Sequence, residues 1–196
     1  MTFLICTSNT GKVKEFKERL PHYQFMTLKD EAIFIDIDET GSSFEENALI
    51  KLTTIISKYP YLVDKYDFIL AEDSGLCVDA LDGAPGIFSA RYAGEHGNDV
   101  LNNQHLLSEL AQSSNRSAHY EVCIAVHYRS KNYLFHGKVN GMISEEPKGD
   151  NGFGYDPLFI PDGYSSTFGE LNNTVKLKIS HRTAAIDLMM NTFHLE

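Results

Sequence analysis

The chain has 196 residues, of which 42% are hydrophobic and 22% are charged. This composition is typical of a folded globular protein and excludes a disordered chain. Lysine and arginine number 17 against 27 aspartates and glutamates, which gives a net charge of −10. A negative field of this size repels nucleic acids and anionic membranes, so we expect neither as a partner, while a small anionic ligand is not excluded. The length is compatible with one domain or with two closely packed lobes.

The cysteines are Cys6, Cys77 and Cys123. An odd number without a C-x-x-C motif predicts buried free thiols in a reducing compartment, with a catalytic cysteine–histidine pair as the alternative. The first residues lack the basic region of a signal peptide, and no stretch approaches the roughly 18 apolar residues of a membrane span. We therefore expect a soluble, cytoplasmic protein.

The first part of the chain predicts alternating strands and helices. Residues 3–6 form an apolar run that predicts a buried strand, and a helix is expected from near Lys12 until Pro21 ends it. Two short strands are expected over residues 24–28 and 33–37.

The next elements begin at recognisable helix signals. Residues 43–46 form a capping box, in which the serine hydroxyl and the glutamate carboxylate accept from each other's amides at the start of a helix. Residues 68–71 predict a central strand, and the Gly- and Pro-bearing residues 73–97 predict a long loop. Asn98 is expected to cap a helix that ends near Ala111.

The last third predicts a hairpin and a final helix. Polar and apolar residues alternate over 118–127, and a turn at 129–132 leads to a second strand over 133–139. Residues 145–156 predict a glycine-rich loop, and a helix is expected over 181–193. Because helices and strands alternate early and a hairpin follows, we expect an α/β fold with a mixed sheet.

Two segments have the chemistry of a phosphate and metal site. The turn over residues 7–12 precedes a helix, so its amides and Lys12 favour an anion, although many such turns bind nothing. Glu72 and Asp73 follow the strand over 68–71, where α/β sheets bind ligands and where carboxylates suit Mg²⁺. A solvated acidic turn is the alternative for this pair.

Two later segments have the chemistry of a base-binding site. Glycines flank Phe153, which leaves its ring free to stack on a purine, and Asp156 can accept a hydrogen bond. His181 and Arg182 are donors that suit purine acceptors. The alternatives are a glycine turn with a buried ring and a helix start with exposed bases.

Taken together and in this order, the motifs resemble the inosine-triphosphatase-like family of pyrophosphatases, which act on non-standard purine nucleoside triphosphates. The matching motifs span almost the whole chain and are Thr7-Ser-Asn-Thr-Gly-Lys12, Glu39-Thr-Gly41, Phe44-Glu-Glu-Asn-Ala48, Glu72-Asp-Ser-Gly-Leu76, Gly83-Ala-Pro-Gly86, Ser89-Ala-Arg-Tyr-Ala-Gly94, Gly152-Phe-Gly-Tyr-Asp-Pro157 and Ser180-His-Arg182.

The resemblance implies hydrolysis of dITP, ITP or XTP to the monophosphate and pyrophosphate, which clears deaminated purines from the nucleotide pool. It also implies Mg²⁺ as cofactor and a homodimer. The implied architecture is a single domain over residues 1–196, with an elongated mixed β-sheet and two α/β lobes that flank a central substrate cleft.

The resemblance also assigns roles to residues. Asp73 is expected to accept the proton of the attacking water and, with Glu39 and Glu72, to bind Mg²⁺. The expected phosphate-binding residues are Thr7, Ser8, Asn9, Thr10, Gly11, Lys12, Lys51, Ser74 and Lys176. The expected base-binding residues are Phe153, Gly154, Tyr155, Asp156, His181 and Arg182.

Two positions depart from the family pattern. Val175 stands where an acidic residue usually precedes the phosphate lysine, so Lys178 is an alternative to Lys176. Glu72 stands where the family has a second aspartate, which preserves the charge. Two other functions stay open: hydrolysis of other modified nucleotides in the same cleft, and nucleotide binding without catalysis.

Overall fold

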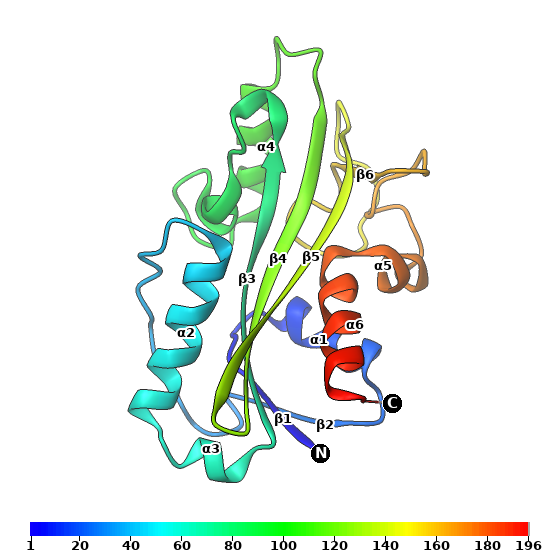
Figure 1. The fold of residues 1–196 in the computed structure, drawn as a ribbon. Coiled ribbons are helices and arrows are strands. Elements are labelled where there is room, and N and C mark those ends of the chain that lie inside the picture. The colour runs from blue at the N-terminus through cyan, green and yellow to red at the C-terminus, as the bar shows by residue number, and fades with distance from the viewer. Residues whose placement is uncertain (196) are drawn as a thin grey trace. The chain divides into compact units, whose positions relative to one another are not determined.

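The computed structural model describes residues 1–195, which form one six-stranded sheet of order β2-β1-β3-β4-β5-β6 (Figure 1). The strands are β1 (Thr2–Ile5), β2 (Gln24–Thr27), β3 (Phe68–Val78), β4 (Ser117–Tyr128), β5 (Lys131–Ile143) and β6 (Phe159–Pro161). β1 pairs in parallel with β2 and with β3, whereas β5 and β6 are antiparallel. The prediction of an α/β fold with a mixed sheet is confirmed.

Six α-helices and two short 3₁₀ helices are assigned among residues 1–195. They are α1 (Thr10–Arg19), α2 (Phe44–Lys58), α3 (Leu62–Lys65), η1 (Asp79–Leu81), η2 (Gly86–Arg91), α4 (Asp99–Glu109), α5 (Asn173–Ile179) and α6 (His181–Phe193). Within this described part, no helix combines the length and the apolar character that a membrane span requires.

The chain divides into two compact units. Unit 1 comprises Met1–Asp73, Val122–Gly137 and the segment that begins at Arg182, and unit 2 comprises Ser74–Glu121 and Lys138–His181. The division therefore falls inside β3, directly after Asp73, and between His181 and Arg182.

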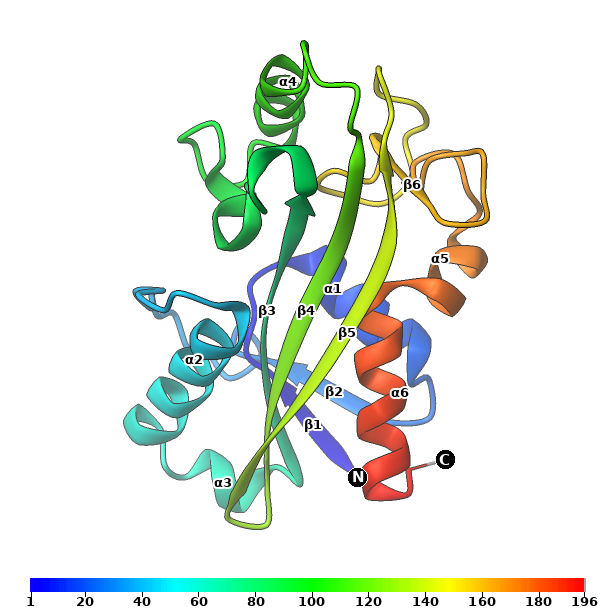
Figure 2. The same cartoon turned by 45° about the horizontal axis from the view of Figure 1, so that its top comes forward.

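The sheet of unit 1 is covered on both faces (Figure 2). Phe16 of α1 and Met189 of α6 belong to one apolar core with Phe3 and Phe68. The rings of Phe3 and Phe68 stack with centroids 4.6 Å apart. Buried residues of α2, including Leu52, cover the opposite face. Because side chains alternate along a strand, this layering decides which helix each residue of β3 faces.

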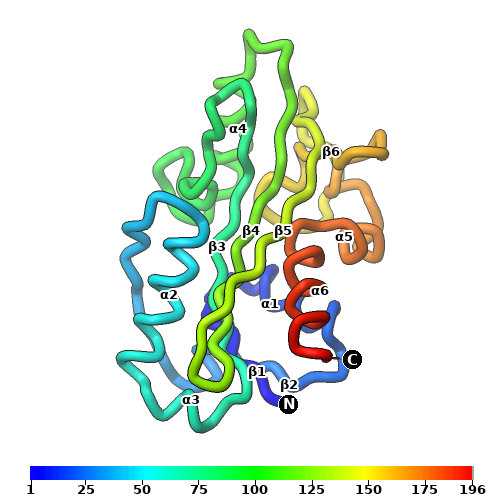
Figure 3. The backbone as a smooth tube through the Cα atoms, viewed as in Figure 1, coloured from blue at the N-terminus to red at the C-terminus, as the bar shows by residue number. Residues whose placement is uncertain are grey.

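Helix starts follow the predicted local signals. The side chain of Ser43 accepts from the amide of Glu46 at 3.2 Å, and Asn98 caps α4 by accepting from the amide of Leu101 at 3.1 Å. The capping box differs in one bond: the carboxylate of Glu46 accepts from the amide of Ser42 at 2.6 Å. The β4–β5 turn also lies where predicted, and is traced in Figure 3.

Two predictions about elements are wrong, and three observed α-helices and strands were not predicted. β3 does not end at residue 71 but continues to Val78, so residues 73–78 are strand and not loop, and residues 33–37 form no strand. The three that were not predicted are α3, β6 and α5. The Asp-Ser-Gly sequence after residue 72 favours a turn locally, but pairing within the sheet overrides local propensity. Buried charges in β3 are tolerated there because cations from other elements offset them.

Candidate functional site

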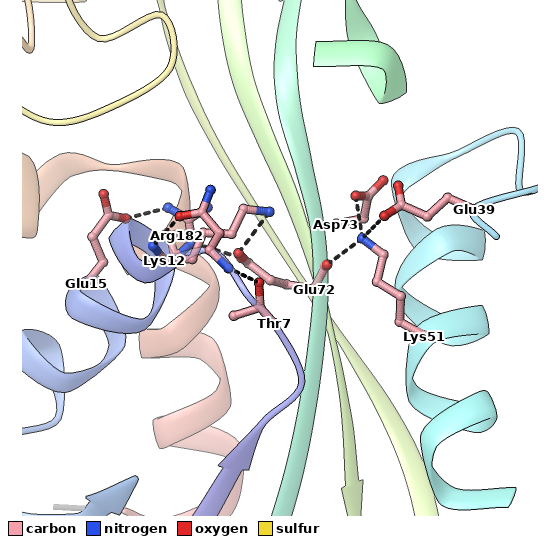
Figure 4. Close-up of polar contacts among 9 residues, drawn as sticks. Thr7, Lys12, Glu15, Glu39, Lys51, Glu72, Asp73 and Arg182 are labelled. Carbon is pink, nitrogen blue, oxygen red and sulfur yellow. Dashed lines mark hydrogen bonds and ion pairs between the residues drawn. The ribbon is translucent and has the colours of Figure 1, made fainter. Parts of the chain in front are cut away.

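Glu72 and Asp73 are neighbours in β3, so their side chains point to opposite faces of the sheet. Both residues are buried, with exposed fractions of 3% and 5%. Figure 4 shows the carboxylate of Glu72 directed toward α1 and α6, and that of Asp73 directed toward α2. The acidic pair therefore takes part in two separate charged clusters of unit 1. The three expected metal ligands do not lie together.

The cluster around Glu72 is a chain of ion pairs (Figure 4). Oε1 of Glu72 lies 3.2 Å from Nζ of Lys12, and Oε2 accepts a hydrogen bond from Nε of Arg182 at 2.8 Å. Nη1 of Arg182 contacts the carboxylate of Glu15. Burial by itself raises the pKa of Glu72, but the charges of Arg182 and Lys12 outweigh burial and lower it to about 2. Glu72 is therefore an anion that engages two cations.

The cluster around Asp73 is held by one lysine. Nζ of Lys51 lies 2.8 Å from Oδ1 of Asp73 and 3.0 Å from Oε1 of Glu39. It also donates to the backbone carbonyl of Glu72 at 3.1 Å. Burial raises the pKa of Asp73 in spite of the opposing charge of Lys51. Desolvation lowers the pKa of Lys51, but attraction to Asp73 and Glu39 outweighs it, so this pKa is raised.

The turn between β1 and α1 is shaped by its own side chains. Oδ1 of Asn9 accepts from the amide of Lys12 at 3.1 Å, and Oγ1 of Thr7 accepts from the amide of Asn9 at 3.2 Å. Ser8 and Thr10 are exposed, and Thr7 is half-buried. Asn9 thus caps the helix and fixes Lys12 at its first turn, where Lys12 meets Glu72.

A second group of predicted residues lies together in unit 2. Oδ2 of the buried Asp156 accepts from Nζ of Lys176 at 2.6 Å and from the amide of Phe153 at 2.8 Å. Nζ of Lys176 lies 4.7 Å from the centroid of the Phe153 ring. Gly152 has φ +81°, and a Cβ there would lie 1.9 Å from Oδ2 of Asp156. Lys178 is exposed, so Lys176 is the lysine that joins this group.

Two side chains of α4 and one backbone carbonyl of η2 hold the same segment. The amide of Gly154 donates to Oδ2 of Asp99 at 2.7 Å, and Nδ2 of Asn103 donates to the carbonyl of Gly154 at 3.1 Å. The hydroxyl of Tyr155 donates to the carbonyl of Ser89 at 2.8 Å. Asp99 and Asn103 are not among the residues that the sequence predicts. Their only signal is a spacing of one helical turn, which places both on one face of α4.

The remaining predicted residues have different surroundings. His181 is buried in unit 2, and its ring stacks on Tyr120 with centroids 4.9 Å apart. Arg182 belongs to unit 1, where Glu72 and Glu15 engage its guanidinium. Ser74 is half-buried at the start of unit 2. His181 and Arg182 are neighbours in sequence but have different partners. His181 stacks on an aromatic ring, whereas Arg182 contacts two carboxylates.

Two of the three cysteines, Cys6 and Cys77, have the surroundings of unreactive thiols. Cys6 and Cys123 are buried, Cys77 is half-buried, and none of the three forms a disulfide. Sγ of Cys123 lies 3.9 Å from Nε2 of His136. Burial raises the pKa of Cys6 to about 12 and that of Cys77 to about 11. Neither is a thiolate near neutral pH, and the thiolate is the reactive form.

Glu39 and Asp73 fit a divalent cation. Their carboxylates already share one positive charge, the ammonium of Lys51. Among residues 1–195, no group of three or more His, Cys, Asp or Glu side chains is placed to hold a metal ion. Mg²⁺ needs no such group, because it commonly takes one or two carboxylates and completes its shell with water and substrate phosphates. Glu72 fits less well, because its carboxylate is engaged by Arg182 and Lys12.

The fold and these clusters define an α/β protein in which buried carboxylates lie beside lysines. The lysines suit an anionic ligand, and the carboxylates suit a cation. Residues 3–192 match the Ham1 family. A protein named dITP/XTP pyrophosphatase from Campylobacter hominis is 44% identical over 195 residues, covering 96% of this chain and 95% of that protein. The structure of the Staphylococcus aureus Ham1 protein matches with a TM-score of 0.86 and 36% identity, covering 99% of this chain and 98% of that chain.

A Ham1 protein structure from Coxiella burnetii gives the same TM-score, 0.86, at 34% identity, and covers 100% of both chains. A family match over nearly the whole chain and relatives well above 30% identity agree with the likeness of the folds. The chain belongs to the Ham1 family.

Proposed function

We propose that this protein hydrolyses dITP, XTP and ITP to the nucleoside monophosphate and pyrophosphate. The observation that carries the proposal is the buried Asp73, which shares Lys51 with Glu39. The name dITP/XTP pyrophosphatase of relatives such as the Campylobacter hominis protein supports the same reaction. Phosphoryl transfer depends mostly on positioning and on neutralisation of charge, which this set of residues supplies.

Asp73 is the proposed catalytic base. Water attacks the α-phosphorus in line with the bond to the leaving pyrophosphate, and a carboxylate oxygen of Asp73 accepts the proton of that water. Burial raises the affinity of this carboxylate for a proton, which suits a base. Lys51 contacts Asp73 in the free protein and is available to a phosphate oxygen once the cation binds.

Glu39 and Asp73 are the proposed ligands of Mg²⁺. When bound, the ion neutralises phosphate charge and polarises the phosphoryl oxygens. The amides of residues 7–11 and the ammonium of Lys12 face the triphosphate in this proposal, and Ser74 is proposed as a further phosphate-binding residue. Glu72 is assigned to holding Lys12 in place, because its carboxylate lies against that lysine and Arg182.

The base site in this proposal is built on Phe153, whose ring stacks on the purine. Lys176 was expected at the phosphates, but it lies beside Phe153 and is therefore assigned here as a donor to the base, with His181 as a second donor. Asp156 is an acceptor that orients Lys176. Hypoxanthine and xanthine carry a carbonyl at C6, which accepts from these donors. Adenine carries an amino group there, which leaves donors unpaired and is strongly rejected. Arg182 was expected to read the base, but its contacts with Glu72 and Glu15 favour a supporting role.

The test is an assay of pyrophosphate release from dITP, XTP, ATP, GTP and a modified pyrimidine triphosphate, with Mg²⁺ and with excess EDTA. We expect dITP and XTP to exceed ATP by about 10²-fold or more, because the wrong group at C6 leaves buried donors unpaired. EDTA should abolish turnover. Similar rates on ATP and dITP, or release of orthophosphate instead of pyrophosphate, would contradict the proposal. A preference for the pyrimidine triphosphate would change the proposed substrate class to other modified nucleotides.

We further propose a homodimer and two lobes with a substrate cleft, which the family resemblance implies. We also propose the cytoplasmic location that the sequence analysis leads us to expect. Light scattering coupled to gel filtration tests the dimer, and a monomer at micromolar concentration would remove it. A crystal grown with inosine monophosphate and Mg²⁺ tests the cleft and the assignment of base and phosphate residues.

A further inference from the structure

Asn47 is a fully buried polar residue of α2, with an exposed fraction of 0%. Its neighbours in α2, Ala48 and Leu52, belong to the apolar face of the helix. Burying an amide is costly unless its oxygen and nitrogen both form hydrogen bonds. In this protein both do, and each bond leads to a different acidic segment of the candidate site.

The hydrogen bonds fix the orientation of the amide. The backbone amide of Gly41 can only donate, so the atom 2.8 Å from it is Oδ1 of Asn47. The NH₂ group must then point to Asp73, and Nδ2 lies 3.2 Å from Oδ2 of that carboxylate. Asn47 thus donates to Asp73 and accepts from the segment that carries Glu39.

The contact with Gly41 is close. A Cβ on Gly41 would lie 2.7 Å from Oδ1 of Asn47 and 2.7 Å from Cβ of Glu46. Any side chain at position 41 would therefore push the loop away from the amide. The glycine of the Glu39-Thr-Gly41 motif thus lets this loop approach α2.

Two residues of one helix face hold the two oxygens of Asp73. Lys51 follows Asn47 by one turn of α2 and lies 2.8 Å from Oδ1, while Asn47 donates to Oδ2. Lys51 also reaches Glu39, but its ammonium is a flexible point charge. The amide of Asn47 is the directional link between the two carboxylate-bearing segments.

We propose that Asn47 is a positioning residue that couples the Glu39 segment to Asp73, so that both carboxylates are presented together to one divalent cation. This inference rests on the proposed function, because it assigns Glu39 and Asp73 to the cation. Residues that orient metal ligands from outside typically contribute about 10- to 100-fold to metal affinity or activity.

The test uses Asn47→Ala and two readouts. The first is the dissociation constant of Mn²⁺ for the nucleotide-free protein, measured by electron paramagnetic resonance. The second is kcat and KM for dITP. We expect Asn47→Ala to weaken Mn²⁺ binding about 10-fold and to lower kcat about 10- to 100-fold, with KM changed less than about threefold.

Gly41→Ala tests the same link from the other side. It should weaken Mn²⁺ binding in the same direction, because the added methyl group displaces the amide. In the double variant the contact with Oδ1 of Asn47 is gone, whereas the contact with Cβ of Glu46 stays. Because both single variants break the same bond between Gly41 and Asn47, their effects should add less than fully.

Ser43→Ala is the matched control in α2. It removes the hydrogen bond that caps the helix, yet touches neither Asp73 nor Glu39. It should keep the Mn²⁺ affinity and kcat of the wild type.

The inference is overturned if Asn47→Ala keeps its Mn²⁺ affinity and kcat within twofold of the wild type, or if Ser43→Ala loses as much as Asn47→Ala. It is also overturned if the effects of Asn47→Ala and Gly41→Ala add fully, or if the wild type binds no Mn²⁺. A wild type that binds Mn²⁺ but does not hydrolyse dITP would reject the proposed function alone, because the Mn²⁺ comparison would still decide the role of Asn47.

Discussion

At the scale of the residue, Glu72 and Asp73 are two adjacent carboxylates with opposite pKa shifts. Glu72 is paired with Arg182 and Lys12, and its pKa is lowered to about 2. Burial raises the pKa of Asp73 against the opposing charges of Lys51 and Lys12. The same strand thus carries a permanent anion on one face and a basic carboxylate on the other.

Glu72 makes stability depend on pH. Its pKa in the folded protein, about 2, lies below the ordinary value of 4.5, so its contribution is complete above pH 4.5 and is lost as the pH falls toward 2. Glu72→Gln should lower the free energy of unfolding at pH 7 by about 3 kcal/mol, because it leaves Lys12 without this anion and Arg182 with Glu15 alone. The difference between wild type and variant should shrink between pH 4.5 and 2. Urea unfolding across this range checks it, and a constant difference would contradict it.

Asp73 should be needed for chemistry more than for binding. Asp73→Asn keeps the size of the side chain but removes the proton acceptor, so kcat for dITP should fall about 10²- to 10⁴-fold. Single-turnover rates measure the chemical step, and equilibrium titration with dITP should give binding close to that of the wild type. The control is Asp79→Asn, an exposed carboxyl in η1. Retained turnover in Asp73→Asn would remove Asp73 from the role of base.

At the scale of the element, α4 supports the segment that carries Phe153. Asp99 and Asn103 lie one turn apart and engage the amide and the carbonyl of Gly154. Gly154 has φ +63°, so this peptide has a conformation that needs both glycine and external support. Helix α4 therefore helps to position the ring of Phe153, although no residue of α4 was predicted to belong to the site.

Asp99→Ala should loosen the proposed base platform. Loss of a hydrogen bond to a charged acceptor costs about 1.5 to 3 kcal/mol, which predicts an increase in KM for dITP of about 10-fold or more, with kcat changed much less. Asp99→Asn keeps an acceptor oxygen for the amide of Gly154 and should stay close to the wild type. Steady-state kinetics compares the two variants. Equal KM values for Asp99→Ala and the wild type would show that α4 does not position the ring.

At the scale of the whole molecule, the net charge of −10 disfavours nucleic-acid polymers as ligands but does not exclude free nucleotides. The lysines of the candidate site, Lys12, Lys51 and Lys176, are each paired with a carboxylate. They form no exposed basic surface that a phosphate backbone could follow. A nucleotide with its own Mg²⁺ is the better match.

A single-stranded DNA of about 20 nucleotides that contains deoxyinosine should therefore neither bind nor be cleaved. Fluorescence anisotropy at about 50 mM salt tests binding, and gel electrophoresis tests cleavage, with dITP hydrolysis in the same buffer as the positive control. Binding that weakens steeply with salt would reveal a basic surface and contradict the prediction.

Local signals made much of the fold predictable. Ser43 and Asn98 cap helices because each accepts from an amide three residues away, a contact that the neighbouring sequence decides. The alternating pattern over 118–127 likewise predicted β4. The family assignment, made from the order of the motifs, is confirmed.

The sequence by itself determined the types and order of most elements, the family, and the set of residues to consider. Only the tertiary structure decided that β3 continues through Glu72 and Asp73, that these two face different clusters, and that Asn47 joins Asp73 to Gly41. The physical reason is distance along the chain. Arg182 and Glu72 are 110 positions apart. A partner that far away leaves no periodic or local signal, yet its charge decides whether a carboxylate can remain in a buried strand.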